Sequence, residues 1–186
     1  MTSSDQDLLA QIRKGNQAAF GQLVEKYKSY SFTVALRIVH SREDAEEIAQ
    51  DVFVKIYHML HTFQGASSFK TWLYAITYRT AIDYTRRNRK HQHDSLDPGL
   101  SLSDPAQQHN PGQDHLKQML HALLARLKPA DAALITFFYL EDLSIREISE
   151  ITGMGSNNIK TRLFRLREQL RHTLENDYQL KLNDLL

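Results

Sequence analysis

One stretch of the sequence, residues 91–114, divides the chain because its composition is that of a linker. It contains no Lys or Arg and holds three of the four prolines. Its few leucines follow no sustained helical or strand period, so it cannot bury enough apolar area to offset the entropy of ordering it. As a flexible coil its ends would lie about 27 Å apart on average. The sequence therefore predicts two modules, residues 1–90 and 115–186, joined by a flexible tether.

The composition excludes several kinds of functional site. The 186 residues include no cysteine, which excludes a disulfide framework, an iron–sulfur cluster and a cysteine nucleophile. No apolar run approaches the roughly 18 residues that a membrane span needs. The polar, acidic N-terminal segment also lacks the pattern of a signal peptide. We expect a protein of a reducing compartment that is not itself inserted in a membrane.

The formal net charge is only +1, but the charges are unevenly distributed along the chain. Residues 41–60 carry five acidic and two basic side chains, whereas residues 70–90 carry six basic and one acidic. Residues 156–171 carry five basic and one acidic. Two basic patches and one acidic patch favour two contacts with a polyanion and one contact with a different partner.

The N-terminal module has the apolar spacing of helices, and strand-like alternation is nowhere sustained. One helical apolar face is expected over residues 20–38. Ser41 and Asp44 form a variant of the capping box, which predicts the start of a second helix. A turn is expected over residues 63–67, and a third helix is expected to begin near Ser68 and to end in a basic tail.

The C-terminal module is also helical in its spacing, without repeating the sequence of the first. A proline is well placed to open a helix over residues 129–137. Ser144 and Glu147 form a capping box before the next apolar positions. Residues 153–155 break the chain, and Ser156 is expected to cap a final helix. The expected fold class is all-α, with two small helical domains joined by a flexible linker and a helix-turn-helix in the C-terminal domain.

The two short helices over residues 143–171 point to DNA binding. The second has an apolar seam on one side. The side chains elsewhere on it are polar or basic: Asn158, Lys160, Thr161, Arg162 and Arg165. Phe164 lies off the seam, where it could contact a thymine methyl group. This arrangement is typical of a recognition helix in the major groove. The alternative is an arginine-rich surface helix with one partly buried phenylalanine.

Residues 69–90 interleave aromatic and basic side chains. Aromatic rings stack on unpaired bases and basic groups follow phosphates, so this segment is a candidate platform for single-stranded DNA. The alternative is that Trp72 and Tyr84 belong to the core and that the basic run is a solvated helix end, favoured by the helix dipole. We prefer the core role for Trp72 alone and the binding role for the cluster.

Five acidic residues lie in the first turns of the helix that begins after Ser41. Carboxylates at this end of a helix complement its dipole, which is the simpler explanation. Gln50, Val54 and Lys55 lie outside the apolar stripe of the same helix. They leave a mixed surface on which a partner protein could dock.

The sequence contains no recognisable catalytic motif. There is no glycine-rich phosphate loop, no HExxH and no GxSxG. His58 and His61 are three residues apart, and His91 and His93 begin the linker, but neither pair has a convincing third metal ligand. We therefore expect no catalytic residue, no metal and no cofactor, and a small metal-dependent hydrolase is disfavoured.

Three motifs together resemble those of the extracytoplasmic-function (ECF) sigma factors, the minimal members of the bacterial sigma-70 family. Residues 44–53 look like the family's core-polymerase-binding helix. Residues 69–87 are similar to its minus-ten promoter helix, and residues 144–163 to its minus-thirty-five helix-turn-helix. The resemblance covers nearly the whole chain, and the motifs follow one another in the family's order across a polar linker.

The resemblance implies a transcription initiation factor that binds core RNA polymerase and recruits it to promoters. The residues matched to polymerase binding are Asp44, Glu47, Gln50, Asp51 and Phe53. Those matched to the melted minus-ten strand are Gln64, Ser67, Lys70, Arg79, Asp83, Arg86 and Arg87, with Lys70, Arg79 and Asp83 expected on one helix face. Those matched to the minus-thirty-five duplex are Lys160, Thr161, Phe164 and Arg165.

The resemblance also implies domains and partners. Residues 1–90 would form a region 2-like domain, and residues 115–186 a region 4-like domain. The partners would be promoter DNA, as duplex and as single strand, and an anti-sigma factor, with no small-molecule substrate. The location would be cytoplasmic, including retention at the inner membrane by the anti-sigma factor. Many members carry Asn where this chain has Arg79, so the family's base preference at the minus-ten element does not carry over to this chain.

The competing interpretation is a stand-alone helix-turn-helix transcriptional regulator. Such a protein would bind a palindromic operator tightly, as a dimer and without polymerase. The sequence has no convincing dimerisation heptad and no effector domain, which disfavours this interpretation.

Overall fold

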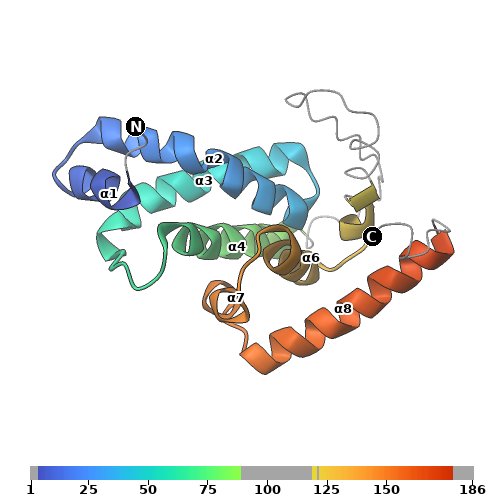
Figure 1. Ribbon diagram of the computed structural model, residues 1–186. Helices are drawn as coiled ribbons and strands as arrows, with labels where there is room; N and C mark the ends of the chain where they lie inside the picture. Colours follow the sequence, from blue (N-terminus) through green and yellow to red (C-terminus); the bar gives the residue numbers. More distant parts are fainter. Residues whose placement is uncertain (1–3, 89–118, 121, 178–186) are drawn as a thin grey trace. The chain divides into compact units, whose positions relative to one another are not determined.

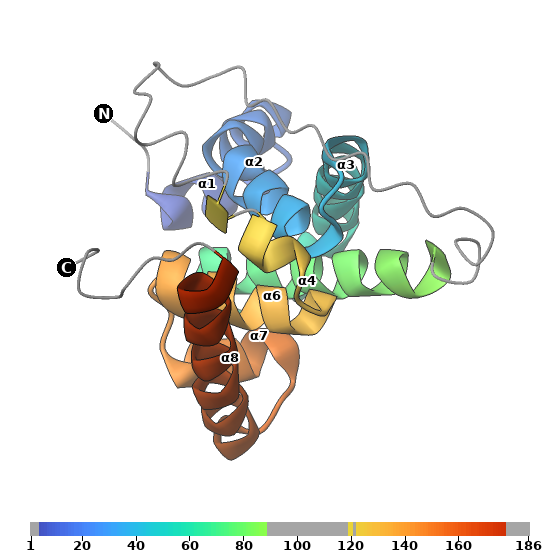
Figure 2. The same cartoon turned by 90° about the vertical axis from the view of Figure 1, so that its right-hand side faces the viewer.

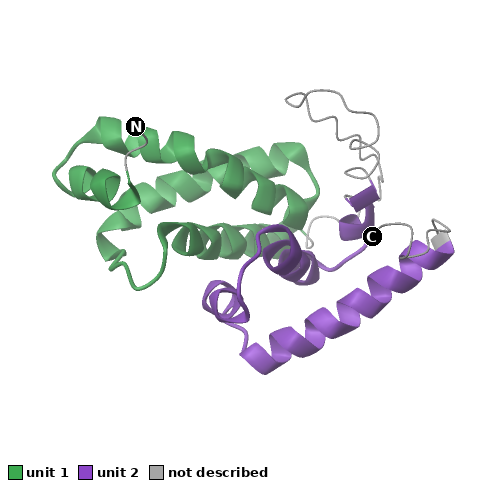
Figure 3. Cartoon of the chain, viewed as in Figure 1, with its two compact units in different colours: residues 1–100 green, residues 101–186 purple. Residues whose placement is uncertain are grey.

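The computed structural model describes residues 4–88, 119–120 and 122–177. These residues form helices and turns, with no strand among them, so the expected all-α class is confirmed for this part of the chain. The chain divides into two compact units, unit 1 within residues 1–100 and unit 2 within residues 101–186 (Figure 3). The linker predicted at residues 91–114 and the end of the basic tail at residues 89–90 lie outside the described residues.

Unit 1 is built from helices that pack along their lengths. They are α1 (Asp5–Arg13), α2 (Gln17–Val39), α3 (Arg42–Met59), the short 3-10 turn η1 (Leu60–Thr62) and α4 (Phe69–Asn88). Helices α2, α3 and α4 pack against one another, and α1 packs on α2 (Figure 1, Figure 2). The apolar face expected over residues 20–38 lies on α2, and most of its side chains are buried.

The core of unit 1 lies where α2, α3 and α4 meet. Its fully buried side chains include Leu23, Val34, Ile38, Ile48, Ile56, Leu73 and Tyr74. They recur at helical spacing, which puts the apolar side chains of each helix on one face. A polar pair lies among them, since the hydroxyl oxygens of Ser31 and Thr77 are 3.1 Å apart. Because a buried hydroxyl without a partner is costly, this pair favours one alignment of α2 against α4.

Helix α1 was not expected from the sequence. Its N-cap, Ser4, forms a capping box with Asp7, and the Ser4 hydroxyl accepts a hydrogen bond from the Asp7 N–H at 3.2 Å. Leu8 and Leu9 follow in the helix and are buried. The local signal for this start is a serine followed three positions later by an acidic residue, ahead of an apolar pair.

The start of α3 agrees only in part with the predicted capping box. The Ser41 hydroxyl accepts from the Asp44 N–H at 3.3 Å, so Ser41 is the N-cap as expected. The Asp44 carboxylate accepts a hydrogen bond from the Tyr84 hydroxyl at 2.6 Å. The box is one-sided because a side chain of α4 takes the carboxylate, and sequence spacing within α3 carries no information about that partner.

Unit 2 contains α6 (Pro129–Ile135), the π-helical turn η3 (Thr136–Leu140), α7 (Ile145–Thr152) and α8 (Ser156–Asp177). Pro129 opens α6 at its first position, as predicted. The helix expected over residues 129–137 is α-helical only to Ile135. It then widens into η3, in which the Glu141 N–H donates to the Thr136 carbonyl five residues back, at 3.0 Å.

Helices α7 and α8 form the predicted helix-turn-helix. The capping box at Ser144 is confirmed. Gly153 ends α7 with φ +73°, a left-handed conformation that glycine adopts without strain. The prediction that Ser156 caps α8 is wrong by one residue. Helix α8 begins at Ser156, because the Gly155 carbonyl accepts its first hydrogen bond, from the Ile159 N–H at 3.1 Å.

Candidate functional site

The acidic residues of α3 differ in solvent exposure. Glu47, Gln50 and Asp51 are exposed, whereas Asp44 is half-buried and holds Tyr84. Burial, together with the hydrogen bond to the Asp44 carboxylate, raises the pKa of Tyr84 above its ordinary value. Among the residues matched to polymerase binding, Asp44 therefore has a tertiary bond within unit 1, from α3 to α4.

Lys55 has a similar position on α3. The sequence placed it on a mixed surface open to a partner, but its ammonium group donates to the Thr80 hydroxyl of α4 at 3.0 Å. This bond and the bond between Asp44 and Tyr84 fasten α3 to α4 at two points along the helix. Lys55 is exposed, as expected for that surface, and its ammonium group already has a partner within unit 1.

An apolar groove of about 480 Å³ lies between α2 and α3. Its lining residues are Phe20, Val24, Lys28, Ala49, Gln50, Phe53, Val54 and Tyr57. Phe53 is only 8% exposed and presents little surface of its own, while Val54 and Tyr57 are 58% and 50% exposed. The ring of Phe20 packs edge-on against that of Tyr57, with centroids 5.1 Å apart. An exposed apolar groove on a folded domain is a typical protein-docking surface.

The short loop between η1 and α4, residues 63–68, is closed by aromatic contacts at its two ends. The ring of Phe63 lies 5.8 Å from that of Phe69 and 5.1 Å from that of Trp72. Gly65 has φ +75°, a left-handed conformation that lets the loop turn. These contacts agree with the preferred interpretation of Trp72 as a packing residue.

The same loop presents the two residues matched to an unpaired base. Gln64 is exposed and Ser67 is half-buried. At the end of the loop, the Ser68 hydroxyl accepts from the Thr71 N–H at 3.0 Å and so caps α4. The loop is thus fixed where it joins the helices and open between them.

Lys70 lies on a different side of α4 from the other residues matched to the minus-ten strand. Its ammonium group is 4.8 Å from the ring centroid of Tyr30, on α2, and 5.3 Å from that of Tyr74. Arg79 is nine positions further along α4, and at about 100° per residue its side chain leaves the helix about half a turn away. The expectation of one face shared by Lys70, Arg79 and Asp83 is therefore wrong.

The exposed end of α4 carries the remaining charged residues of this set. Arg79, Asp83, Arg86 and Arg87 are all exposed. The Asp83 carboxylate accepts from an Arg86 guanidinium nitrogen at 2.8 Å, and Arg87 Nε donates to the Asp83 carbonyl at 3.3 Å. Exposed ion pairs of this kind contribute little to stability, so these side chains can exchange partners at low cost.

In unit 2 the four residues matched to the minus-thirty-five duplex share the solvent face of α8. Lys160, Thr161, Phe164 and Arg165 are all exposed, and Phe164 is 58% exposed. The Arg167 guanidinium lies 5.5 Å from the ring centroid of Phe164. A large exposed aromatic ring beside basic groups suits contact with base edges and backbone in a major groove.

The opposite side of α8 is anchored to the rest of unit 2. Ile159, Leu163 and Leu166 are buried, as the predicted seam requires. Arg162, expected among the polar groups that enter the groove, has its guanidinium on Asp131 of α6, with Nη2 at 2.6 Å and Nε at 3.0 Å from one carboxylate oxygen. Arg162 therefore anchors α8 to α6 instead of projecting from the exposed face with the other polar groups.

A shallow groove of about 300 Å³ borders the exposed face of α8. It is lined by Phe138, Tyr139, Ile145, Lys160, Leu163, Phe164 and Arg167. Tyr139 is exposed and lies in η3, and its ring packs against that of Phe138 with centroids 4.9 Å apart. This surface could not be predicted from the helical period, because that period indicates no π-helical turn.

The described residues add two observations on other kinds of site. In this part of the chain, no three His, Asp or Glu side chains come together as metal ligands. Within the same residues, no helix has the length and apolarity to cross a membrane.

Comparison with known families follows the two units. Residues 23–91 match the model of sigma-70 region 2, and residues 117–170 match that of sigma-70 region 4. The ECF RNA polymerase sigma-E factor of Haemophilus influenzae is 30% identical over 188 residues, covering 92% of this chain and 96% of the relative. The ECF RNA polymerase sigma factor SigW of Bacillus subtilis is 28% identical, covering 89% of this chain and 94% of the relative.

Two solved structures share the fold. The structure of CnrH in complex with the cytosolic domain of CnrY has a TM-score of 0.69 at 23% identity, covering 94% of this chain and 99% of that chain. The sigma factor RpoE of Bartonella quintana, solved in complex with the anti-sigma factor NepR, has a TM-score of 0.70 at 21% identity, covering 85% of this chain and 98% of that chain.

Proposed function

The chain belongs to the ECF sigma factors of the sigma-70 family, which bind core RNA polymerase and direct transcription initiation, and we propose which of its surfaces meet each partner. The observation that carries the proposal is that the region 2 and region 4 matches fall in separate compact units, each with its own exposed polar and aromatic surface.

We propose that the polymerase docks on α3 and on the apolar groove beside it. Glu47 and Asp51 supply exposed negative charge, while Gln50 belongs both to this face and to the groove. The buried Phe53 forms part of the wall of the groove. Asp44 contributes indirectly, because its bond to Tyr84 holds α3 against α4. Apolar contact surrounded by charge gives affinity from burial and specificity from the rim.

Asp51→Arg tests this surface. The variant should weaken association with core polymerase, because it reverses a charge at the centre of the proposed contact. Glu175→Arg, which reverses an exposed charge on α8, outside this groove, is the matched control. Co-elution with core polymerase would measure both, and an Asp51→Arg protein that is folded and binds core normally would make the acidic face of α3 structural only.

We propose that the loop of residues 63–68 and the exposed end of α4 hold the melted minus-ten strand. Gln64 and Ser67 would contact an unpaired base, while Arg79 and Arg86 lie where phosphates or a second base can reach them. Unstacking a base costs a few kcal/mol, which the correct base recovers in a fitted site. Lys70, whose ammonium group lies near the rings of Tyr30 on α2 and Tyr74 on α4, would contact the strand from another direction.

We propose that α8 reads the minus-thirty-five duplex through Lys160, Thr161, Phe164 and Arg165. The support is their shared exposure on the face opposite the buried seam. Arg162 positions this face through Asp131.

We propose domains at residues 1–90 and 115–186, with residues 91–114 as the tether. A tether of this length keeps each weak DNA-binding module at a high effective concentration once the other is bound. No bond chemistry is required of this chain in that role, so we propose that it is not an enzyme.

We further propose an anti-sigma factor as partner and a cytoplasmic location, including retention at the inner membrane through that partner. The support is that CnrH and the Bartonella quintana sigma factor, which share this fold, were both solved in complexes, the latter with an anti-sigma factor.

One experiment separates this function from a stand-alone regulator. The full chain is mixed with core polymerase and a promoter library, and specific transcripts are sequenced. We expect transcripts from a defined set of promoters only when both proteins are present. Tight binding to a short palindromic operator without polymerase, and no transcription with it, would favour the stand-alone regulator.

A further inference from the structure

Helix α1, which was not among the expected helices, is firmly attached to α2. The Asp5 carboxylate accepts hydrogen bonds from the Lys26 ammonium group at 2.6 Å and from the Tyr27 hydroxyl. Burial and the hydrogen bond to this carboxylate raise the pKa of Tyr27 well above its ordinary value, so the hydroxyl remains a donor. Leu8 and Leu9 of α1 are also buried, so the helix is held in place up to its last turn.

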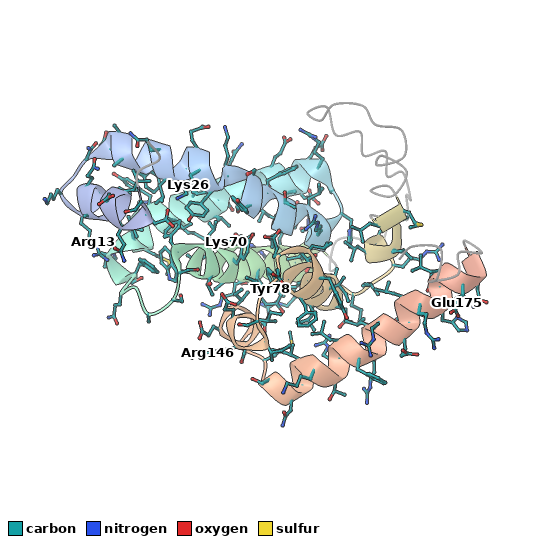
Figure 4. The ribbon with its side chains drawn as sticks, viewed as in Figure 1. Arg13, Lys26, Lys70, Tyr78, Arg146 and Glu175 are labelled. Carbon is teal, nitrogen blue, oxygen red and sulfur yellow. The ribbon has the colours of Figure 1, made fainter. Side chains whose placement is uncertain are left out.

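That last turn carries Arg13, whose guanidinium reaches a distant part of the chain (Figure 4). Arg13 Nη2 donates to the Phe63 carbonyl oxygen at 2.7 Å, a partly buried bond between residues 50 positions apart. A cation near a helix C-terminus is favourable by itself and needs no such partner. A charge-assisted hydrogen bond is stronger than a neutral one, so it can fix the orientation of the Phe63 peptide group.

Phe63 is the first residue of the loop that presents Gln64 and Ser67. Its side chain is buried, 7% exposed, against the rings of Phe69 and Trp72. Its carbonyl is held from the other side by Arg13. Both the side chain and the main chain at the entry to the loop are therefore fixed, while the Gln64 side chain is exposed.

We infer that Arg13 is a positioning residue for promoter recognition, which holds the loop of residues 63–68 in the conformation that accepts an unpaired base. Helix α1 then belongs functionally to the minus-ten reader, although it lies outside the matched region 2 segment that begins at residue 23. Arg13 acts through the Phe63 carbonyl. The inference rests on the proposed role of the loop in holding a melted strand.

The test uses the full chain assembled with core polymerase. Fork-junction DNA with a single-stranded minus-ten segment is varied one base at a time, and the affinity ratio of correct to wrong base is measured at each position. Arg13→Met keeps the length of the side chain but has no donor. We expect it to lower the ratio about tenfold at the base held by the loop, which corresponds to about 1.4 kcal/mol. Lys14→Met, at the neighbouring exposed residue, is the matched control and should leave every ratio unchanged.

The outcomes separate the inference from the function on which it rests. If the original chain discriminates at one unpaired base and Arg13→Met discriminates equally well, or loses affinity uniformly at all positions, Arg13 is only structural and the inference is wrong. If the original chain shows no preference at any unpaired base, the proposed role of the loop fails first. Should Arg13→Met not fold, Arg13→Gln, too short to keep the same bond, undergoes the same comparison.

Discussion

Helices α8 and α4 carry the two proposed DNA-binding surfaces, but they differ in whether the residues around that surface also belong to the core. In α8 the anchoring residues form one stripe and the reading residues another, so Leu163 is buried beside an exposed Phe164. In α4 and its preceding loop the aromatic residues that bracket the binding surface are themselves core, as Phe63 and Phe69 show. Recognition should therefore be separable from stability in unit 2 and coupled to it in unit 1.

The largest effect is expected from Phe69→Ala in unit 1. Phe69 is 2% exposed and packs against the rings of Tyr27, Phe63 and Trp72, so truncation should lower the unfolding free energy of unit 1 by about 3–5 kcal/mol. Minus-ten strand binding should be lost with it. Trp72 is the only tryptophan, so its fluorescence in denaturant follows unit 1 within the full chain. A stable variant that still binds the strand would break the proposed coupling.

Arg162→Ala should have the next largest effect, in unit 2. The guanidinium and Asp131 form a partly buried pair, and hydrogen bonds to charged groups are worth about 1.5–3 kcal/mol. We expect faster amide hydrogen exchange along α8 and weaker duplex binding as a consequence. Arg146→Ala removes an exposed pair with Glu150 in the same unit and is the matched control. Equal effects of the two changes would mean that Arg162 does not anchor α8.

Arg165→Ala should affect binding and leave folding unchanged. If Arg165 reads a base edge, duplex affinity should fall by about 1–3 kcal/mol for the preferred minus-thirty-five sequence only. The unfolding transition should stay within about 0.5 kcal/mol of the original chain, as for most surface substitutions. Titration against a set of duplexes measures the affinities, and denaturant unfolding followed by circular dichroism measures the stability. An equal loss of affinity on every sequence would identify a phosphate contact.

Tyr84→Phe should have the smallest effect and also a pH signature. Loss of the bond to Asp44 should cost about 0.5–1.5 kcal/mol. Because the pKa of Tyr84 is raised in the folded chain, its contribution is complete below its ordinary pKa of about 10 and disappears as the pH rises through the folded value. The difference in stability between the two proteins should therefore shrink in alkaline solution. A constant difference across that range would show that the hydroxyl is not held by the carboxylate.

Much of the candidate site could be predicted because its residues stand on regular helices. The seam of α8 and the exposure of Phe164 follow from a local period of 3.6 residues. Two of the differences concern side chains with partners on other elements. Arg162, expected in the groove, pairs with Asp131. Arg13 binds the Phe63 carbonyl. The shared face expected for Lys70 and Arg79 fails on the helical period alone, since nine residues place them about half a turn apart.

Local patterns alone specify the order of the two units, the helix-turn-helix and the starts of α3, α6 and α7, since capping residues, apolar spacing and turn glycines act between residues a few positions apart. The packing of the helices settles which charged groups remain available to a partner and which are already bound. Asp44, Arg162 and Arg13 each hold a residue 31 to 50 positions away. No local pattern specifies such a pair, because packing of the intervening helices brings its members together.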